Sequence, residues 1–254
     1  MVVEDQPACF GDRVIGFVSS IDEGQMSLGW DDPVEEVLAN RSCFLGECGL
    51  TIDQATIVQV RYTPSSRYDV IKEVSAKDCG VGMRRADGPI AGCLIAGVPG
   101  VALFLPVADC IPAILYDPKN HVLALAHLGR HNSIANLTTK VVKHLQSSFK
   151  SNPADLLVWL GPSISPENYA LERVDFAKND ENWKPYTQKV DNGFLVDLRG
   201  YAQNSFLKAG VKKSGIFHSG NNTATHPKYW SHYTEVTVRG RKPPPRFAAL
   251  CALK

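Results

Sequence analysis

VALFLPVADCIPAILYDPKNHVLALAH, residues 101–127, is the stretch that decides the fold of this chain. It holds three apolar runs, at 101–110, 111–117 and 121–127. Continuous apolar runs of this kind are typical of strands covered on both faces, so we expect them to form the centre of a buried sheet. The residues DPKN at 117–120 predict a tight turn, and therefore a hairpin between the second and third runs.

Other predicted elements flank this centre on both sides. Asp32 and Pro33 begin a predicted helix that runs to residue 45, with Val34 on its apolar face. The remaining predicted elements are helices at 133–149 and 197–210 and strands at 55–61, 68–74, 155–160, 214–218 and 246–253. Strands and helices do not alternate regularly, which favours an α+β fold, a mixed sheet core flanked by helices, over a Rossmann sheet. Without a composition shift, we expect a single domain over 1–254.

The composition narrows the classes of partner and compartment. Lysine and arginine (27) nearly balance aspartate and glutamate (26), so no strong field favours nucleic acid or an anionic membrane, and a small molecule is the expected partner. No apolar stretch is long enough to span a membrane. Seven cysteines without a CxxC pair, together with an acidic start of the chain, favour reduced thiols and a cytoplasmic location.

Cys110 and His127 are the first candidates for chemistry. Each lies at the end of an apolar run, and the predicted hairpin brings these two ends to the same rim of the sheet, with Asp109 beside the cysteine. A thiolate and an imidazole that meet there can bind zinc or act as a nucleophile with its base. The alternative is structural, because a cysteine after a core strand often packs as a small hydrophobic residue.

A polar loop, GRHN at 129–132, follows His127 and leads into a predicted helix. Its Arg130 and His131 are candidates for binding a phosphate or carboxylate, and a solvated capping loop is the alternative. His218, His226 and His232 are weaker candidates. The chain has no GxGxxG, P-loop or GxSxG motif, so we expect no nicotinamide or flavin cofactor and no serine hydrolase elbow.

Several motifs resemble those of the YfiH-type family, also called the laccase-domain or multicopper polyphenol oxidase family. The central stretch resembles its "PGVALAVRTADCVPVLLADP…VVAAVHAGWRG" signature. The other matching segments, in family order, are MSLGWDDPVEEVLANR (26–41), ADG (86–88), LGPSISPENY (160–169), DLRGYAQNSFLKAGV (197–211) and YWSHY (229–233) followed by RFAAL. The resemblance extends over nearly the whole chain.

The resemblance implies a mixed sheet flanked by helices and a zinc ion held by a His, a Cys and a His. It also implies cleavage of purine nucleosides with phosphate and deamination of adenosine, while some members edit peptidoglycan precursors. The family's cysteine falls on Cys110 and its second histidine on His127. Its "NR" arginine falls on Arg41, a candidate anion contact, and its "DG" aspartate on Asp87, a candidate substrate contact. The fold is also similar to that of cysteine-dependent toxin deamidases.

The chain departs from the family at two motifs. The first zinc histidine belongs to "QVHG", and Arg61 stands in its place here, in QVRYTPSSRYD at 59–69. Arginine does not bind metals, so the zinc site loses one of three ligands. The family's "HAGWRG" reads HLGRHN at 127–132. Copper oxidation of phenols is not expected either, because seven histidines with no HxH pair are too few for a multicopper centre.

Three hypotheses follow from these residues. The leading one is an enzyme that processes purine nucleosides with phosphate, with Cys110, His127 and Asp109 as catalytic residues and Arg41, Asp87, Arg130 and His131 binding substrate. The second is a catalytically impaired relative that binds a ligand or partner protein through the same pocket. The third is a hydrolase or deamidase that uses a metal-free pair of Cys110 and His127.

Overall fold

A computed structural model of the chain describes residues 1–2, 5–28, 33–57, 67–86, 88, 90–241 and 244–254. The larger of its two main sheets has the strand order β12-β8-β6-β7-β4-β3. Its strands are β3 (Ile71–Val74), β4 (Cys93–Ala96), β6 (Ile111–Asp117), β7 (Val122–Leu128), β8 (Leu157–Leu160) and β12 (Ile216–His218). Parallel and antiparallel pairs occur together, so the sheet is mixed, as the sequence predicts.

The second main sheet has the order β1-β13-β5-β2. Its strands are β1 (Val14–Val18), β2 (Ala55–Ile57), β5 (Ala102–Val107) and β13 (Phe247–Leu253). The last strand of the chain therefore lies between the first strand and β5. Strands from both ends and from the middle of the sequence complete this sheet.

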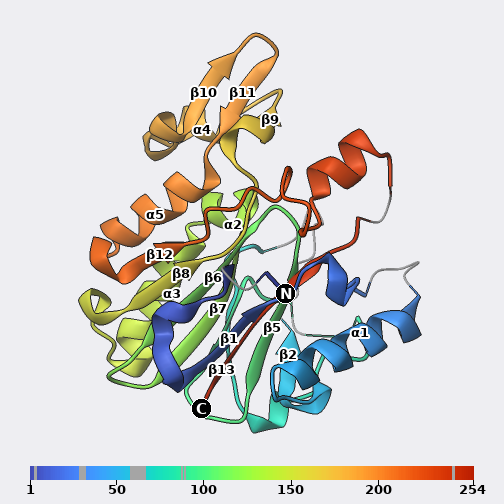
Figure 1. Cartoon of the computed structure of the whole chain (residues 1–254). Coiled ribbons are helices and arrows are strands. Elements are labelled where there is room, and N and C mark those ends of the chain that lie inside the picture. Colours follow the sequence, from blue (N-terminus) through green and yellow to red (C-terminus); the bar gives the residue numbers. More distant parts are fainter. Residues whose placement is uncertain (3–4, 29–32, 58–66, 87, 89, 242–243) are drawn as a thin grey trace.

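The two sheets pack face to face between outer helices. Alternate residues of β5 and β13 point into two different cores, Leu103 toward the larger sheet and Phe104 toward α1 (Val34–Glu47). The opposite face of the larger sheet is covered by α3 (Leu137–Phe149) and α5 (Leu198–Lys208). Figure 1 shows these helices and α1 on opposite sides of the sheets. The predicted burial of the central strands on both faces is confirmed, because every residue of β6 and β7 is buried.

The predicted hairpin between β6 and β7 is also confirmed. The two strands pair antiparallel from Ile111 opposite Leu128 to Asp117 opposite Val122. Asp117 holds the turn, because its Oδ1 accepts hydrogen bonds from the backbone N–H groups of Lys119 (2.8 Å) and Asn120 (3.1 Å). The start of β6 and the end of β7 therefore meet at one rim of the sheet.

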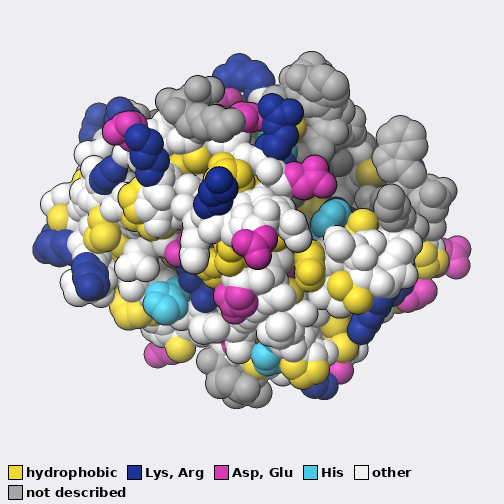
Figure 2. All heavy atoms as spheres, turned by 90° about the horizontal axis from the view of Figure 1, so that it is seen from above, with side chains coloured by type: hydrophobic (Ala, Val, Ile, Leu, Met, Phe, Trp, Pro, Cys, Tyr) yellow, Lys and Arg dark blue, Asp and Glu magenta, His cyan; other side chains and the backbone are white. Residues whose placement is uncertain are grey.

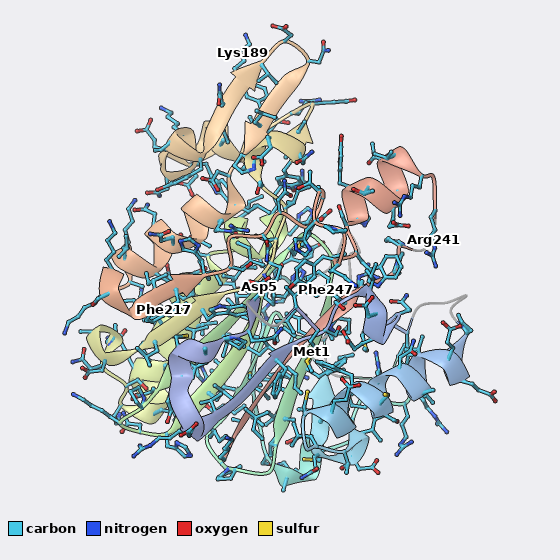
Figure 3. The ribbon with its side chains drawn as sticks, viewed as in Figure 1. Met1, Asp5, Lys189, Phe217, Arg241 and Phe247 are labelled. Atoms are coloured by element: carbon cyan, nitrogen blue, oxygen red, sulfur yellow. The ribbon has the colours of Figure 1, made fainter. Side chains whose placement is uncertain are left out.

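A small sheet stands apart from the two main ones. It consists of β9 (Ala170–Leu171), β10 (Thr187–Val190) and β11 (Gly193–Val196), with α4 (Asp175–Asn179) beside it. Figure 3 shows Lys189 at the tip of this projection, and Phe217 on the outer edge strand of the larger sheet. The projection is attached through Trp183, whose ring stacks on Tyr201 of α5.

The prediction of one helix over 133–149 is wrong in its boundaries. The chain instead forms α2 (Arg130–Ile134) and then α3, separated by Asn136 in the left-handed conformation with φ of 59°. Asparagine tolerates this conformation better than most residues, so it permits the break. Ile134, at the end of α2, is 40% exposed. The expected loop at 129–132 is largely the first turn of α2.

The first predicted helix is confirmed as α1, although it begins at Val34, with Pro33 as its N-cap, and ends at Glu47 rather than at residue 45. Asp32, at the predicted start, lies outside the described residues. Val34 was placed on the apolar face by its spacing, and it is 48% exposed. The buried face is formed by Val37, Arg41, Phe44 and Leu45 instead. A charged residue thus occupies a position of the buried stripe.

Substitution of Lys150 by glycine is expected to stabilise the fold. Lys150 ends α3 with φ of 59°, a conformation that costs a non-glycine residue about 1 kcal/mol and glycine almost nothing. We expect the free energy of unfolding, measured by urea denaturation, to rise by about 0.5–1 kcal/mol in Lys150→Gly. Lys150→Ala is the control and should bring no gain, so an equal rise in both variants would contradict this explanation.

Two further expectations can be compared with the structure. All seven cysteines lie in the described part of the chain, where no disulfide bond joins any two of them. Within the described residues, every helix is too short or too polar to cross a lipid bilayer.

Candidate active site

Cys110 and His127 converge at the rim where β6 begins and β7 ends. His127 pairs across the hairpin with Pro112, and Pro112 follows Cys110 by two residues. A β-carbon built on Gly129 would lie 2.7 Å from Cys110 Sγ and 3.1 Å from His127 Cε1. Sulfur and imidazole therefore approach the same small space, which only a residue without a side chain leaves open. The predicted meeting of these two residues is what the geometry shows.

Substitution of Gly129 by alanine is expected to disturb this meeting point. The new methyl group would overlap Cys110 Sγ, and overpacking of this kind costs about 1–3 kcal/mol. We expect urea denaturation to show that loss in Gly129→Ala. Gly46→Ala in α1 is the matched control, since its β-carbon would meet nothing within 4 Å and alanine favours a helix. Equal stability of the two variants would show that the site accommodates the added methyl group without cost.

Asn132 fixes the state of the His127 ring. His127 Nδ1 donates a hydrogen bond of 2.9 Å to Asn132 Oδ1, and Asn132 Nδ2 donates one of 2.8 Å to the carbonyl oxygen of Tyr68. Because the second bond fixes the orientation of the amide, its oxygen faces the imidazole. Burial lowers the pKa of His127 to about 4, although the bond with Asn132 acts in the other direction. The ring is therefore neutral near pH 7, with its proton on Nδ1 and a lone pair on Nε2.

Asp109 is buried beside Cys110, and its carboxylate connects the rim to a distant segment. Its Oδ1 accepts a hydrogen bond of 2.6 Å from Thr223 Oγ1, and its Oδ2 accepts one of 2.7 Å from the backbone N–H of Tyr233. Burial raises the pKa of Asp109, while these bonds lower it. Its φ is 73°, a left-handed value that aspartate, like asparagine, tolerates better than most residues, and these contacts hold the backbone next to Cys110 in that conformation.

A cavity of about 180 Å³ is formed by the segment that holds this aspartate, and Asp109 itself does not line it. Thr223 and Ser231 line the cavity, and both also hydrogen-bond to Asp109. Tyr229 and Trp230 supply aromatic walls. The cavity is thus linked to Asp109 through the side chains of Thr223 and Ser231.

Arg130 and His131 lie in the first turn of α2, close to the two central residues. Arg130 Nη2 donates a hydrogen bond of 3.4 Å to His131 Nε2, and the His131 ring stacks on Tyr68 at 4.8 Å. Burial, and then the charge of Arg130, lower the pKa of His131. Burial raises the pKa of Tyr169 to about 12, and the charges of Arg130 and Cys110 both act on this hydroxyl. Tyr169 therefore lies within electrostatic range of both sides of the site.

Arg41 occupies a different environment. It is 0% exposed in α1, where its Nε donates a hydrogen bond of 2.8 Å to the carbonyl oxygen of Met26, and its Nη1 one of 2.6 Å to that of Met83. Its guanidinium lies 5.4 Å from the centre of the Phe104 ring. Burial lowers the pKa of Arg41 to about 10, so it remains charged near pH 7. These contacts give it a structural role, and its contact with an anion stays a prediction.

Two sequence-based candidates lie outside the described residues. These are Arg61, at the position of the family's first histidine, and Asp87, the aspartate of the ADG segment. Their predicted roles are therefore open to experiment alone.

The available ligands do not complete a zinc site. In the described part of the chain, His, Cys, Asp and Glu side chains form no cluster of three or more that could hold a metal ion. Cys110 and His127 are two of the three ligands that a catalytic zinc needs, and the residue at the third position is an arginine. Within the described residues, the side chains therefore do not form the three-ligand zinc site that the resemblance implies.

Several residues of the site were not predicted from the sequence. Asn132, Tyr68 and Tyr169 come from three separate segments, and Thr223 and Tyr233 hold Asp109 from a fourth. The signal available for Asn132 was its position five residues after His127, where a turn into a helix returns the chain to the strand end. The other contacts are long-range and carry no local signal.

The surface near the projecting sheet carries mixed charges. Figure 2, a view from above, shows lysine and arginine side chains spread among acidic and hydrophobic ones over the described part of this face, rather than gathered in one patch. This agrees with the formal net charge of +1. It offers no extended basic surface of the kind that binds a nucleic acid backbone.

Comparisons with known proteins agree with the fold and with the motifs. Purine nucleoside phosphorylase YlmD of Bacillus subtilis is 25% identical over 186 residues, which cover 67% of this chain and 64% of that protein. A purine nucleoside phosphorylase of Xylella fastidiosa is 25% identical over 199 residues, covering 76% and 72%. The chain thus spans less than two thirds of the length of the first of these relatives.

Two solved structures share the fold. YlmD from Geobacillus stearothermophilus has a TM-score of 0.83 at 21% identity, with 96% of this chain and 93% of that chain covered. The protein YfiH of Bacillus licheniformis has a TM-score of 0.86 at 19% identity, with 100% and 98% covered. The family model described as multi-copper polyphenol oxidoreductase laccase matches residues 7–244. Since that match spans nearly the whole sequence, the chain belongs to this laccase-domain family.

Proposed function

We propose that this chain cleaves the N-glycosidic bond of purine nucleosides with phosphate, at the space shared by Cys110 and His127. The observation that carries the proposal is the approach of Cys110 Sγ and the His127 ring to a single point at Gly129, where burial keeps the ring neutral and Asn132 holds its proton on Nδ1. The names of the relatives in Bacillus subtilis and Xylella fastidiosa support the substrate class.

The groups around this point suit the two substrates. The guanidinium of Arg130 and the neighbouring His131 provide hydrogen-bond donors for phosphate oxygens. The cavity linked to Asp109, with Tyr229 and Trp230 in its walls, provides apolar aromatic surface for a purine ring. The carboxylate of Asp109 already accepts hydrogen bonds from Thr223 and Tyr233. Its proposed contribution is therefore to position Cys110 rather than to bind the substrate.

The reaction transfers one proton from phosphate to the purine, and His127 can carry it. A phosphate oxygen bonds to C1′ of the ribose, the bond from C1′ to the purine nitrogen breaks, and the proton of hydrogen phosphate ends on the purine. His127 Nε2 carries a lone pair and can accept this proton and pass it to the departing base. This transfer uses the His127 ring and the two substrates alone.

The test is a phosphate-dependent assay on inosine and adenosine. Purified protein is incubated with each nucleoside, with and without phosphate, and free base, ribose 1-phosphate and deaminated product are separated by liquid chromatography. We expect free base and ribose 1-phosphate only with phosphate, and the adenosine arm also shows whether inosine forms. Zinc analysis of the same sample shows whether activity accompanies metal. A folded protein that converts neither nucleoside would overturn the proposal.

Substitution of Arg130 by alanine is expected to weaken phosphate binding. Loss of a charge-assisted hydrogen bond worth about 1.5–3 kcal/mol corresponds to a rise in the KM for phosphate of about 10- to 100-fold. Steady-state kinetics with varied phosphate measure this change. Arg173→Ala is the matched control, because Arg173 is exposed and forms a surface ion pair with Asp175. A KM that changes equally in both variants would remove Arg130 from the phosphate site.

A further inference from the structure

Cys110, His127 and Asn132 form a sequence of contacts that resembles a thiol nucleophile with its base and a positioning amide. Sγ of Cys110 and Cε1 of His127 both lie against the β-carbon position of Gly129. On the other side of the ring, Nδ1 of His127 donates to Asn132 Oδ1 at 2.9 Å. Since Cε1 is bonded to both ring nitrogens, the edge of the ring that carries Nδ1 and Nε2 faces the space that the sulfur also borders, and Nδ1 is engaged by the amide.

The amide is built into the fold rather than placed at the surface. Asn132 is 0% exposed, and its Nδ2 donates to the carbonyl oxygen of Tyr68 at 2.8 Å. A rotation of the amide by 180° would place its oxygen against the carbonyl oxygen of Tyr68, where no hydrogen bond can form, so its oxygen stays toward His127. This fixes the ring tautomer with the proton on Nδ1, which leaves the Nε2 lone pair for proton transfer.

The same residues explain why a metal is dispensable for such a pair. A zinc ion would need a third ligand, and the described residues offer no cluster of three. A cysteine with a histidine base and an orienting asparagine acts by covalent catalysis and needs no metal. The thiol is half-buried, so a small substrate can reach it, and His127 is buried against the strand end.

We propose that Cys110, His127 and Asn132 form a metal-independent nucleophile, base and positioning residue that act on the carbonyl carbon of a small ester or amide. This activity goes beyond nucleoside phosphorolysis, although it uses the same space. Arg130, in the turn that carries Asn132, favours an acyl substrate with an anionic group.

The step balances without any co-reactant except water. The proton of the Cys110 thiol passes to His127 Nε2, and the sulfur bonds to the carbonyl carbon. The bond from that carbon to the leaving oxygen or nitrogen breaks, and His127 returns the proton to the leaving group. Water then attacks the thioester with His127 as base, which releases the carboxylic acid and restores the thiol.

The experiment uses the full chain, treated with a chelator and checked for metal, with 4-nitrophenyl acetate as the probe. Stopped reactions are analysed by peptide mass spectrometry to locate the acetyl group, and the release of 4-nitrophenol gives the rate. We expect acetylation at Cys110 without metal, and a rate reduced about 100-fold in His127→Ala. Cys43→Ala removes an exposed thiol and is the matched control, with no expected change.

The positioning role of Asn132 is tested with a measurement that would not change if Asn132 only stabilised the fold. In nitrogen-15 NMR of the imidazole groups, we expect His127 to carry its proton on Nδ1 in the natural protein and in Asn132→Asp, which keeps an acceptor oxygen. In Asn132→Ala we expect a mixture of tautomers and an acetylation rate about 10-fold lower, since misorientation of a catalytic group costs up to about 100-fold. Thermal unfolding of the three proteins shows whether they are folded.

The outcomes separate this inference from the proposed function. Acetylation of Cys110 that is unchanged in His127→Ala, or that requires added zinc, would overturn the inference. An Asn132→Ala protein that keeps both the tautomer and the rate would overturn the role of Asn132. The nucleoside assay on the same samples is read independently, so absence of phosphorolysis with retained acetylation contradicts the proposed function alone.

Discussion

Replacement of His127 by alanine is expected to lower kcat/KM for the phosphate-dependent cleavage of inosine by about 10²- to 10⁴-fold, the range for removal of a proton-transfer group. The reason is that His127 holds its own proton on Nδ1 against Asn132 and offers Nε2 to the substrates. Steady-state kinetics at saturating phosphate measure the effect. Little change is expected in the fold, because the smaller side chain leaves the pairing of β6 with β7 intact.

His144→Ala is the matched control for this substitution. His144 lies on α3, and its Nε2 contacts Glu73 Oε1 at 2.7 Å, in a partly exposed ion pair away from the strand ends. Such pairs contribute about 0–1 kcal/mol to stability, so activity should remain within about twofold of the natural protein. Equal losses in the two variants would show that the assay reports a general effect on the fold, and a His127→Ala protein of full activity would contradict the assigned role.

Replacement of Arg41 by alanine is expected to lower the free energy of unfolding by about 3–4 kcal/mol, which is among the largest effects expected of one substitution here. Arg41 is fully buried, and the substitution removes its charge-assisted hydrogen bonds to the carbonyl oxygens of Met26 and Met83. It also leaves a cavity against the Phe104 ring. Urea denaturation at neutral pH measures the change.

Arg84→Ala provides the comparison for Arg41. Arg84 is exposed and forms a surface ion pair with Asp53 at 2.9 Å, so its loss should cost less than about 1 kcal/mol. Arg41→Lys keeps the charge and part of the volume, and its KM for phosphate tests the predicted anion contact. An unchanged KM in folded Arg41→Lys leaves Arg41 a structural role alone, whereas equal stabilities of Arg41→Ala and Arg84→Ala would contradict the importance of its buried bonds.

The central strands could be predicted from the sequence because their signal is local and strong. Continuous apolar runs can only be buried on both faces, and the DPKN turn fixes the hairpin that brings Cys110 near His127. The meeting of these two residues therefore followed from the order of strands and turn. The position of the proton on the His127 ring could not be predicted, because it depends on Asn132 and on the carbonyl oxygen of Tyr68. Tyr68 lies far from His127 in the sequence.

Arg41 and the break at Asn136 show where local reasoning was insufficient. A charged residue in a helix is usually exposed, yet Arg41 follows Val37 by four residues and precedes Leu45 by four, a spacing that places it on the buried face. Its burial is possible because carbonyl oxygens from two distant loops accept its N–H groups. Likewise, the left-handed conformation of Asn136 interrupts a helical pattern that the apolar spacing alone makes continuous.

The central claim is that Cys110 and His127 act together in one site, and a double-mutant cycle tests it most directly. The value of kcat/KM for inosine and phosphate is measured in the natural protein, in Cys110→Ala, in His127→Ala and in the double variant. Residues that act as a unit give non-additive losses, so the double variant should be impaired no more than the worse single variant. Two losses that multiply in the double variant would show that these residues work independently, and would contradict the shared site.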